Sequence, residues 1–185
     1  MKEVDNFLPV DLAKQYYDFG LDVVTGKSGS NHVWTNQAWD RSIIKDSSVV
    51  ICIKLPDEFL QELQDILQLK KYFDPQVDQP LTLSKSAMIY VWSKNSYIPV
   101  HADQVYSKAI TVYLNSSWEY NDGGMFNWFD EKSQEWKNIT PTFNKAVVND
   151  SGYLHGITPV KSSVNRITLQ IFLNPINQDT LRATL

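Results

Sequence analysis

Three short segments in the second half of the chain alternate aliphatic residues with polar or aromatic ones. In the last of them, Ile167 and Leu169 alternate with Arg166 and Thr168. Successive side chains of a β-strand point to opposite faces of its sheet, so each segment has one aliphatic face and one mixed face. The alternation therefore predicts three strands, at residues 86–92, 109–115 and 166–173.

The two faces of these strands allow two interpretations. In the first, the aliphatic face covers the core and the mixed face lies in solvent. In the second, the aliphatic face lies under N-terminal helices, and the mixed face lines a polar cavity between two sheets. Asp122-Gly123-Gly124 marks a turn, and residues 131–133 join 125–129 to 134–139 as a predicted hairpin. Short strands at this spacing favour a sandwich or a barrel, and alternation alone leaves both interpretations open.

The first part of the chain mixes helical and extended patterns. Two sets of hydrophobic residues repeat at helical spacing, and a buried strand is predicted at Val49–Ile53. One helix uses Leu8, Leu12, Tyr16 and Phe19 and is expected to end before Gly20, and the other uses Phe59, Leu60, Leu63, Ile66 and Leu67. We therefore expect a mainly β fold of the α+β type. It would form one domain over residues 1–185, with a support region at 1–80 and a β-rich core at 81–175.

Composition narrows the classes of function. The chain has 185 residues, of which 43% are hydrophobic and 21% charged, so it can bury a sizeable core. No apolar run approaches the roughly 20 residues that a membrane helix needs, so we expect no membrane segment. The net charge of -4, without a basic block, argues against nucleic-acid binding. The single cysteine, Cys52, fits a reducing compartment, and we expect a cytoplasmic protein.

Two of the three histidines stand in contexts that suit a metal site. His101 and Asp103 are two residues apart, so on a strand both side chains point to one face and can converge on an ion. His155, far along the chain, supplies a second imidazole. Two imidazoles and one carboxylate form the iron site of non-haem Fe(II) oxygenases, and the same ligands can hold a catalytic zinc. Taken singly, each histidine is equally compatible with an ordinary strand-end or loop position.

Arg166 shares a strand face with Thr168. An arginine inside a barrel is costly unless it is paired, and its planar guanidinium suits a carboxylate. If the mixed face lines a cavity, Arg166 and Thr168 would anchor a carboxylate, and Tyr113 would add a phenol donor. A second anion site of this kind favours an iron oxygenase with a dicarboxylate cosubstrate over a zinc hydrolase. In the alternative, Arg166 lies on an edge strand and pairs with a surface acid.

In their order, these pieces resemble the Fe(II)/2-oxoglutarate-dependent dioxygenases, and within them the prolyl 4-hydroxylase-like branch. The resemblance covers residues 86–173. It rests on His101-Ala102-Asp103, residues 109–115, Trp118, Asp122-Gly123-Gly124-Met125-Phe126, residues 155–160 and Arg166-Ile167-Thr168. It implies a double-stranded β-helix, a cupin-like jelly roll, backed by the N-terminal helices.

The resemblance also implies a site and a reaction. Iron would be held by His101, Asp103 and His155, and 2-oxoglutarate by Arg166, Thr168, Tyr113 and Tyr90. The enzyme would consume dioxygen and 2-oxoglutarate, release succinate and carbon dioxide, and hydroxylate an unidentified small-molecule or peptide substrate. Prolyl 4-hydroxylation is expected by analogy, with ascorbate as a candidate reductant.

Two other classes of function stay open at this point. One is a catalytically idle jelly-roll binding module that kept the pocket, and the other is a zinc-dependent hydrolase with the same ligands. An aromatic and polar cluster of His32, Trp34, Trp39 and Arg41 would either cover the mouth of the site or pack among helices at the surface. The primary substrate does not follow from the sequence.

Overall fold

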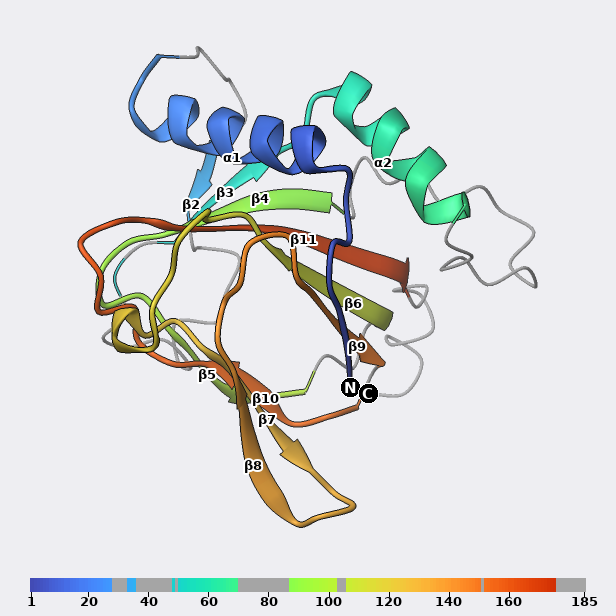
Figure 1. The fold of residues 1–185 in the computed structure, drawn as a ribbon, viewed down its shortest axis with the longest axis vertical. Helices are drawn as coiled ribbons and strands as arrows, with labels where there is room; N and C mark the ends of the chain where they lie inside the picture. Colours follow the sequence, from blue (N-terminus) through green and yellow to red (C-terminus); the bar gives the residue numbers. More distant parts are fainter. Residues whose placement is uncertain are drawn as a thin grey trace, which may run out of the picture.

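Two antiparallel β-sheets form the body of the protein in the computed structural model (Figure 1). The structure describes residues 1–27, 33–35, 48, 50–69, 87–102, 106–150 and 152–175. Within these residues, the larger sheet has seven strands in the order β1-β9-β6-β11-β4-β3-β2, and the smaller sheet has four in the order β5-β10-β7-β8. Neighbouring strands run antiparallel in both sheets. This architecture is the expected jelly roll.

The elements follow the sequence pattern closely in the β-rich part. The larger sheet contains β1 (Lys2–Val4), β2 (Val33–Thr35), β3 (Val50–Lys54), β4 (Ala87–Trp92), β6 (Tyr106–Tyr113), β9 (Ala146–Asp150) and β11 (Arg166–Pro175). The smaller sheet contains β5 (Ile98–His101), β7 (Phe126–Asp130), β8 (Glu135–Ile139) and β10 (His155–Ile157). Two helices, α1 (Val10–Val24) and α2 (Asp57–Leu69), and a 3-10 turn, η3 (Tyr120–Asp122), lie between strands. The three alternating segments are β4, β6 and β11, and the predicted hairpin is β7–β8.

The aliphatic face of the larger sheet lies under the two helices (Figure 1). Ile89 of β4, Ile110 of β6 and Leu169 of β11 are fully buried there, in one cluster with Leu12 of α1 and Leu63 of α2. Burial of such side chains stabilises a fold by roughly 1.5–3 kcal/mol each, so this layer is a main source of stability. The helices cover the sheet because their own apolar stripes repeat at helical spacing.

Helix α1 extends past the point at which we expected it to end. The expected end before Gly20 is wrong, because α1 continues to Val24. A Cβ atom on Gly20 would lie 2.8 Å from Ile89 Cγ2 and 3.2 Å from Ile167 Cγ2. Gly20 therefore serves close packing of the helix on the sheet rather than ending the helix.

The mixed face of the larger sheet points the other way, toward the smaller sheet. Tyr90, Trp92 and Tyr113 lie in a second buried cluster, together with Phe126 and Ile157 of the smaller sheet. The interpretation in which the mixed face lines the space between two sheets is therefore correct. The solvent-exposed alternative is wrong for this face.

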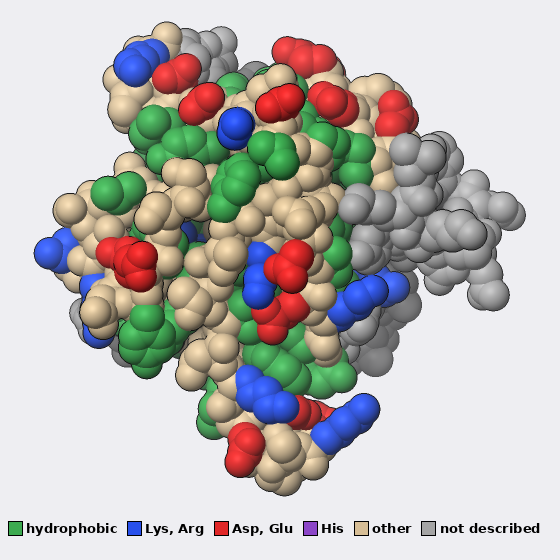
Figure 2. All heavy atoms as spheres, in the orientation of Figure 1, with side chains coloured by type: hydrophobic (Ala, Val, Ile, Leu, Met, Phe, Trp, Pro, Cys, Tyr) green, Lys and Arg blue, Asp and Glu red, His purple; other side chains and the backbone are tan. Residues whose placement is uncertain are grey.

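The outer side of the helices carries charge instead. Figure 2 shows acidic side chains gathered over the helices, and Asp57 and Glu58 occupy the first turn of α2. Acidic groups at that end are stabilised by the helix dipole. Among the described residues, no helix is long and apolar enough to cross a membrane.

Candidate active site

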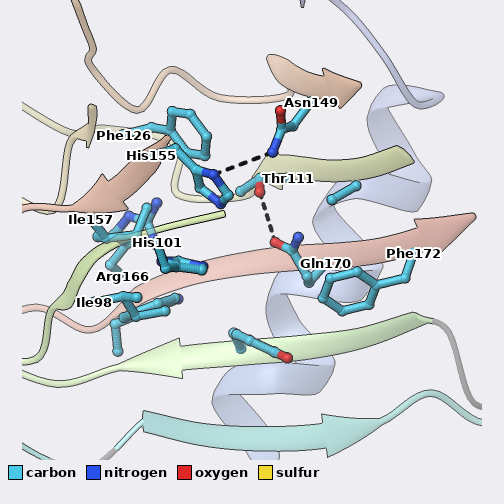
Figure 3. Close-up of a pocket in the computed structure, with 13 residues that line it drawn as sticks. Ile98, His101, Thr111, Phe126, Asn149, His155, Ile157, Arg166, Gln170 and Phe172 are labelled. Atoms are coloured by element: carbon cyan, nitrogen blue, oxygen red, sulfur yellow. Dashed lines mark hydrogen bonds between the residues drawn. The ribbon is translucent and has the colours of Figure 1, made fainter. Parts of the chain in front are cut away.

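A pocket opens between the two sheets, and both sheets contribute to its wall (Figure 3). The space inside it is about 480 Å³, part of which is open to solvent. Its wall includes His101 and His155 from the smaller sheet and Tyr90, Arg166 and Gln170 from the larger sheet. The pocket thus unites residues that are up to 82 positions apart in the chain, from Tyr90 to Phe172.

The two predicted histidines face each other across β5 and β10. His101 and His155 are direct partners in the antiparallel ladder, and their ring centres lie 4.4 Å apart at an interplanar angle of 49°. Figure 3 shows both imidazoles at the pocket. His155 is buried, and the ring of Phe126 stacks on it with centres 5.2 Å apart. The sheet register therefore brings together two imidazoles that the sequence separates by 54 residues.

Backbone carbonyls orient both rings. The Nδ1 atom of His101 lies 2.9 Å from the Pro99 carbonyl oxygen, and Nδ1 of His155 lies 2.9 Å from that of Tyr153. With the proton on Nδ1, each ring donates to its carbonyl and carries its lone pair on Nε2. This is the usual arrangement of a metal-binding histidine, in which the second nitrogen is held by a hydrogen bond.

The predicted third ligand, Asp103, lies outside the described residues. The described residues contain no group of three or more histidine, cysteine or acidic side chains placed to hold a metal ion. The structure thus describes two of the three predicted ligands. The members of the His32, Trp34, Trp39 and Arg41 cluster also fall outside the described side chains.

Arg166 opens β11, which lies between β6 and β4 inside the larger sheet. It is 0% exposed, and none of its three guanidinium nitrogens has a hydrogen-bond partner among the described residues. The guanidinium carbon lies 5.0 Å from the centre of the Trp92 ring and 5.2 Å from that of Tyr113. The hypothesis of an edge-strand arginine paired with a surface acid is therefore wrong.

Burial shifts the pKa values of Arg166 and of its neighbour Tyr113. It lowers the pKa of Arg166 to about 10, and the nearby Tyr113 phenol opposes that shift. Burial also raises the pKa of Tyr113 to about 12, which the positive charge of Arg166 opposes. At neutral pH, Arg166 is therefore a cation and Tyr113 a neutral phenol with a proton to donate. A buried cation without an anionic partner is costly, and an incoming carboxylate would offset that cost.

The other predicted anchor residues surround Arg166. Thr168 pairs with Tyr113 on one side of β11 and with Tyr90 on the other. The Thr168 hydroxyl accepts a hydrogen bond of 3.1 Å from the Trp92 indole nitrogen, and the Tyr113 hydroxyl is buried without a partner among the described residues. The structure therefore places all four predicted cosubstrate residues on one face of three adjacent strands.

Sequence reasoning missed four polar or aromatic residues of this pocket. Trp92 stacks on Arg166, and Asn149 Nδ2 lies 3.3 Å from His155 Nδ1. Thr111 donates a hydrogen bond of 2.7 Å to Gln170. The alternation already placed Trp92, Thr111 and Gln170 on the mixed face, so that signal was present. Asn149 had no such signal, because no strand was predicted at β9.

Comparison with known proteins finds a matching family. Residues 86–174, which include His101, His155 and Arg166, match the model of the 2OG-Fe(II) oxygenase superfamily. The protein is therefore an Fe(II)- and 2-oxoglutarate-dependent oxygenase, as the sequence resemblance implied. No curated protein sequence matches the chain significantly.

Several solved structures are similar to this oxygenase in fold. It matches a prolyl-4-hydroxylase from Pseudomonas putida with a TM-score of 0.67 at 15% identity, over 95% of this chain and 92% of the other. A prolyl hydroxylase from Trichoplax adhaerens, solved with a hypoxia inducible factor oxygen degradation domain peptide, matches with a TM-score of 0.68 at 13% identity, over 100% and 86%. A 2OG-Fe(II) oxygenase family oxidoreductase from Burkholderia pseudomallei matches with a TM-score of 0.59 at 16% identity, over 95% and 96%. At these identities, the likeness establishes a shared fold.

Proposed function

We propose that this oxygenase hydroxylates a C–H bond of a primary substrate and releases succinate and carbon dioxide. One observation carries the proposal: a buried arginine that has no acidic partner among the described residues lies in the same pocket as two facing histidines. Bound Fe(II) supplies the oxygen activation that no protein side chain can perform. The chain's own residues hold the ion, anchor the cosubstrate and shield the reaction from water.

The residues of the pocket fit Fe(II) and 2-oxoglutarate. His101 and His155 would bind the iron through Nε2, because backbone carbonyls engage their Nδ1 atoms. Asp103, two residues after His101, would complete the set of two histidines and one carboxylate. Phe126, stacked on His155, limits the freedom of that ring and keeps one side of it dry.

The cosubstrate anchor is built from the mixed face of the larger sheet. Arg166 would bind the far carboxylate of 2-oxoglutarate, since its guanidinium nitrogens find no partner in the described part of the chain and its charge is already desolvated. The neutral Tyr113 hydroxyl and the Thr168 hydroxyl, which Trp92 orients, would donate to the same carboxylate. Tyr90, next to Thr168 across the strands, would close the side of this subsite.

For the substrate, the proposal is a peptidyl proline. The solved structures that resemble this chain include prolyl hydroxylases, one of them with a bound peptide. The pocket itself supports a dicarboxylate-dependent oxygenase over a zinc hydrolase, and turnover separates the oxygenase from an idle binding module. A zinc hydrolase has no use for a second anion site, and an idle binding module would bind 2-oxoglutarate without converting it.

One experiment separates these three outcomes. Purified protein is mixed anaerobically with Fe(II), and its absorption spectrum is recorded with and without 2-oxoglutarate. Succinate is then measured after oxygen is admitted, alone and with proline-containing peptides. We expect an absorption band that requires both Fe(II) and 2-oxoglutarate, slow succinate formation, and faster formation with a peptide substrate. A band without succinate would indicate a binding module, and tightly held zinc with no response to 2-oxoglutarate would indicate a hydrolase.

A further inference from the structure

Gly124, the second glycine of the Asp122-Gly123-Gly124 turn, lies against the side chain of Arg166. A Cβ atom on Gly124 would be 2.7 Å from Arg166 Cδ, 3.3 Å from Arg166 Nε and 3.1 Å from Val160 Cγ2. A separation of 2.7 Å between such atoms is repulsive, so an added methyl group would require something to move. We propose that Gly124 is a positioning residue for Arg166, because its missing side chain leaves the space through which the arginine reaches the cosubstrate.

The turn that carries Gly124 cannot easily withdraw. The amide of Gly124 donates to the Pro159 carbonyl at 3.2 Å, and Met125 and Thr158 exchange two hydrogen bonds of 2.9 Å. One residue before the glycine pair, the Asp122 carbonyl accepts from the Lys161 amide at 2.7 Å. These bonds hold the turn on the opposite segment from both ends. A side chain at position 124 would therefore displace Arg166 rather than the turn.

The backbone of Arg166 is held just as firmly. The Asn115 side chain donates to the Asn165 carbonyl at 2.8 Å and accepts from the Ile167 amide at 2.7 Å. It thus clamps the residues on both sides of Arg166, and Asn115 is buried. With its backbone clamped, Arg166 could respond to a new methyl group by changing its side-chain torsions. That would move the guanidinium away from its place between the Trp92 and Tyr113 rings.

A competing explanation is that position 124 needs glycine for its backbone alone. Its φ is +61°, a left-handed conformation that glycine adopts readily and most other residues do not. Gly26 separates the two explanations, because it has a φ of +74° and no atom within 4 Å of an added Cβ. Gly26→Ala carries the backbone penalty without the contact. It is the matched control for Gly124→Ala.

The first test measures thermal unfolding and does not depend on the proposed function. We expect Gly124→Ala to lower the Tm more than Gly26→Ala does. In an Arg166→Ala background, which removes Cδ and Nε but leaves the 3.1 Å contact with Val160 Cγ2, Gly124→Ala should lower the Tm by clearly less than it does in the wild type. An equal loss in both backgrounds would refute the contact with Arg166. If Gly124→Ala does not fold, Gly124→Asn and Gly26→Asn replace the pair, since asparagine tolerates this backbone conformation but still has a Cβ.

The second test rests on the proposed function and measures 2-oxoglutarate. We expect Gly124→Ala to raise the KM for 2-oxoglutarate at least tenfold, while kcat at saturating 2-oxoglutarate and Fe(II) affinity stay within about twofold of wild type. Binding titration should show the same loss, and Arg166→Ala should abolish any further effect of Gly124→Ala. An unchanged KM, or an equal added loss without Arg166, would overturn the inference. A wild-type protein that ignores 2-oxoglutarate would instead refute the proposed function, and the unfolding test alone would then decide whether Gly124 acts on Arg166.

Discussion

The same strands build two contrasting faces of the larger sheet. On the helix side, β4, β6 and β11 present aliphatic residues that are fully buried, such as Ile89, Ile110 and Leu169. On the pocket side, they present Arg166, Thr168 and Tyr113, which are equally buried but include polar atoms without partners among the described residues. The buried aliphatic residues of the helix side stabilise the fold, whereas the buried polar residues of the pocket side are placed to bind a ligand. The aliphatic side chains of the helix side have no polar atoms that require partners. The polar atoms of Arg166 and Tyr113 on the pocket side would gain hydrogen-bond partners from a bound ligand.

The largest expected effect is on the pocket side. His101→Ala should abolish Fe(II)-dependent succinate formation, because the iron would lose one of the two imidazoles proposed to bind it, while the free energy of unfolding should stay close to that of the wild type. Iron content and succinate yield measure the loss. His32→Ala is the control and should leave the iron content unchanged. Full activity in His101→Ala, or loss of iron in His32→Ala, would show that another pair of histidines binds the metal.

The second prediction concerns the helix side of the larger sheet. Leu169→Ala, on the helix side of β11, should lower the free energy of unfolding by about 2–5 kcal/mol, because it leaves a cavity in a fully buried layer. Its KM for 2-oxoglutarate should stay near wild type. Urea denaturation and a 2-oxoglutarate titration give the two values. A large change in KM without a loss of stability would mean that the helix-side layer is not the structural one.

Arg166→Ala should show the reverse behaviour on the same strand. We expect 2-oxoglutarate affinity to fall by about 2 kcal/mol or more, because the carboxylate loses a charge-assisted partner. Stability should fall less than in Leu169→Ala, because the variant also removes a buried charge that has no acidic partner among the described residues. Binding titration and urea denaturation check both statements. An unchanged affinity for 2-oxoglutarate would show that Arg166 does not bind the cosubstrate.

The smallest effect is expected from Trp92→Phe. This variant keeps an aromatic ring beside Arg166 but removes the indole N–H that donates to Thr168. We expect 2-oxoglutarate affinity to fall by about 0.5–1.5 kcal/mol, the usual worth of one hydrogen bond. Titration with Fe(II) present measures it. Equal losses in Trp92→Phe and in Thr168→Val, and no larger loss in the double variant, would show that Trp92 acts through Thr168.

Much of this arrangement could be predicted from local pattern. Alternation assigned Arg166 and Thr168 to one face and Ile167 and Leu169 to the other, because side-chain direction in a strand depends on position along the backbone alone. The spacing of His101 and Asp103 predicts a metal-binding pair by the same reasoning, and this stays a prediction because Asp103 lies outside the described residues. Gly20 shows the limit of such reasoning, since a glycine in a helical pattern is read as an end unless its tertiary neighbour is known.

The sequence by itself determined which side chains share a face of the three alternating strands, the β7–β8 hairpin, and which family the ordered motifs resemble. The tertiary structure alone decided that the mixed face points inward, that His101 lies opposite His155, and that Gly124 leaves room for Arg166. His101 and His155 are 54 residues apart, Gly124 and Arg166 are 42 apart, and the helices that cover the aliphatic face are farther still from β11. Such contacts are set by how the sheets pack and in which register the strands pair, and no local pattern of the chain encodes them.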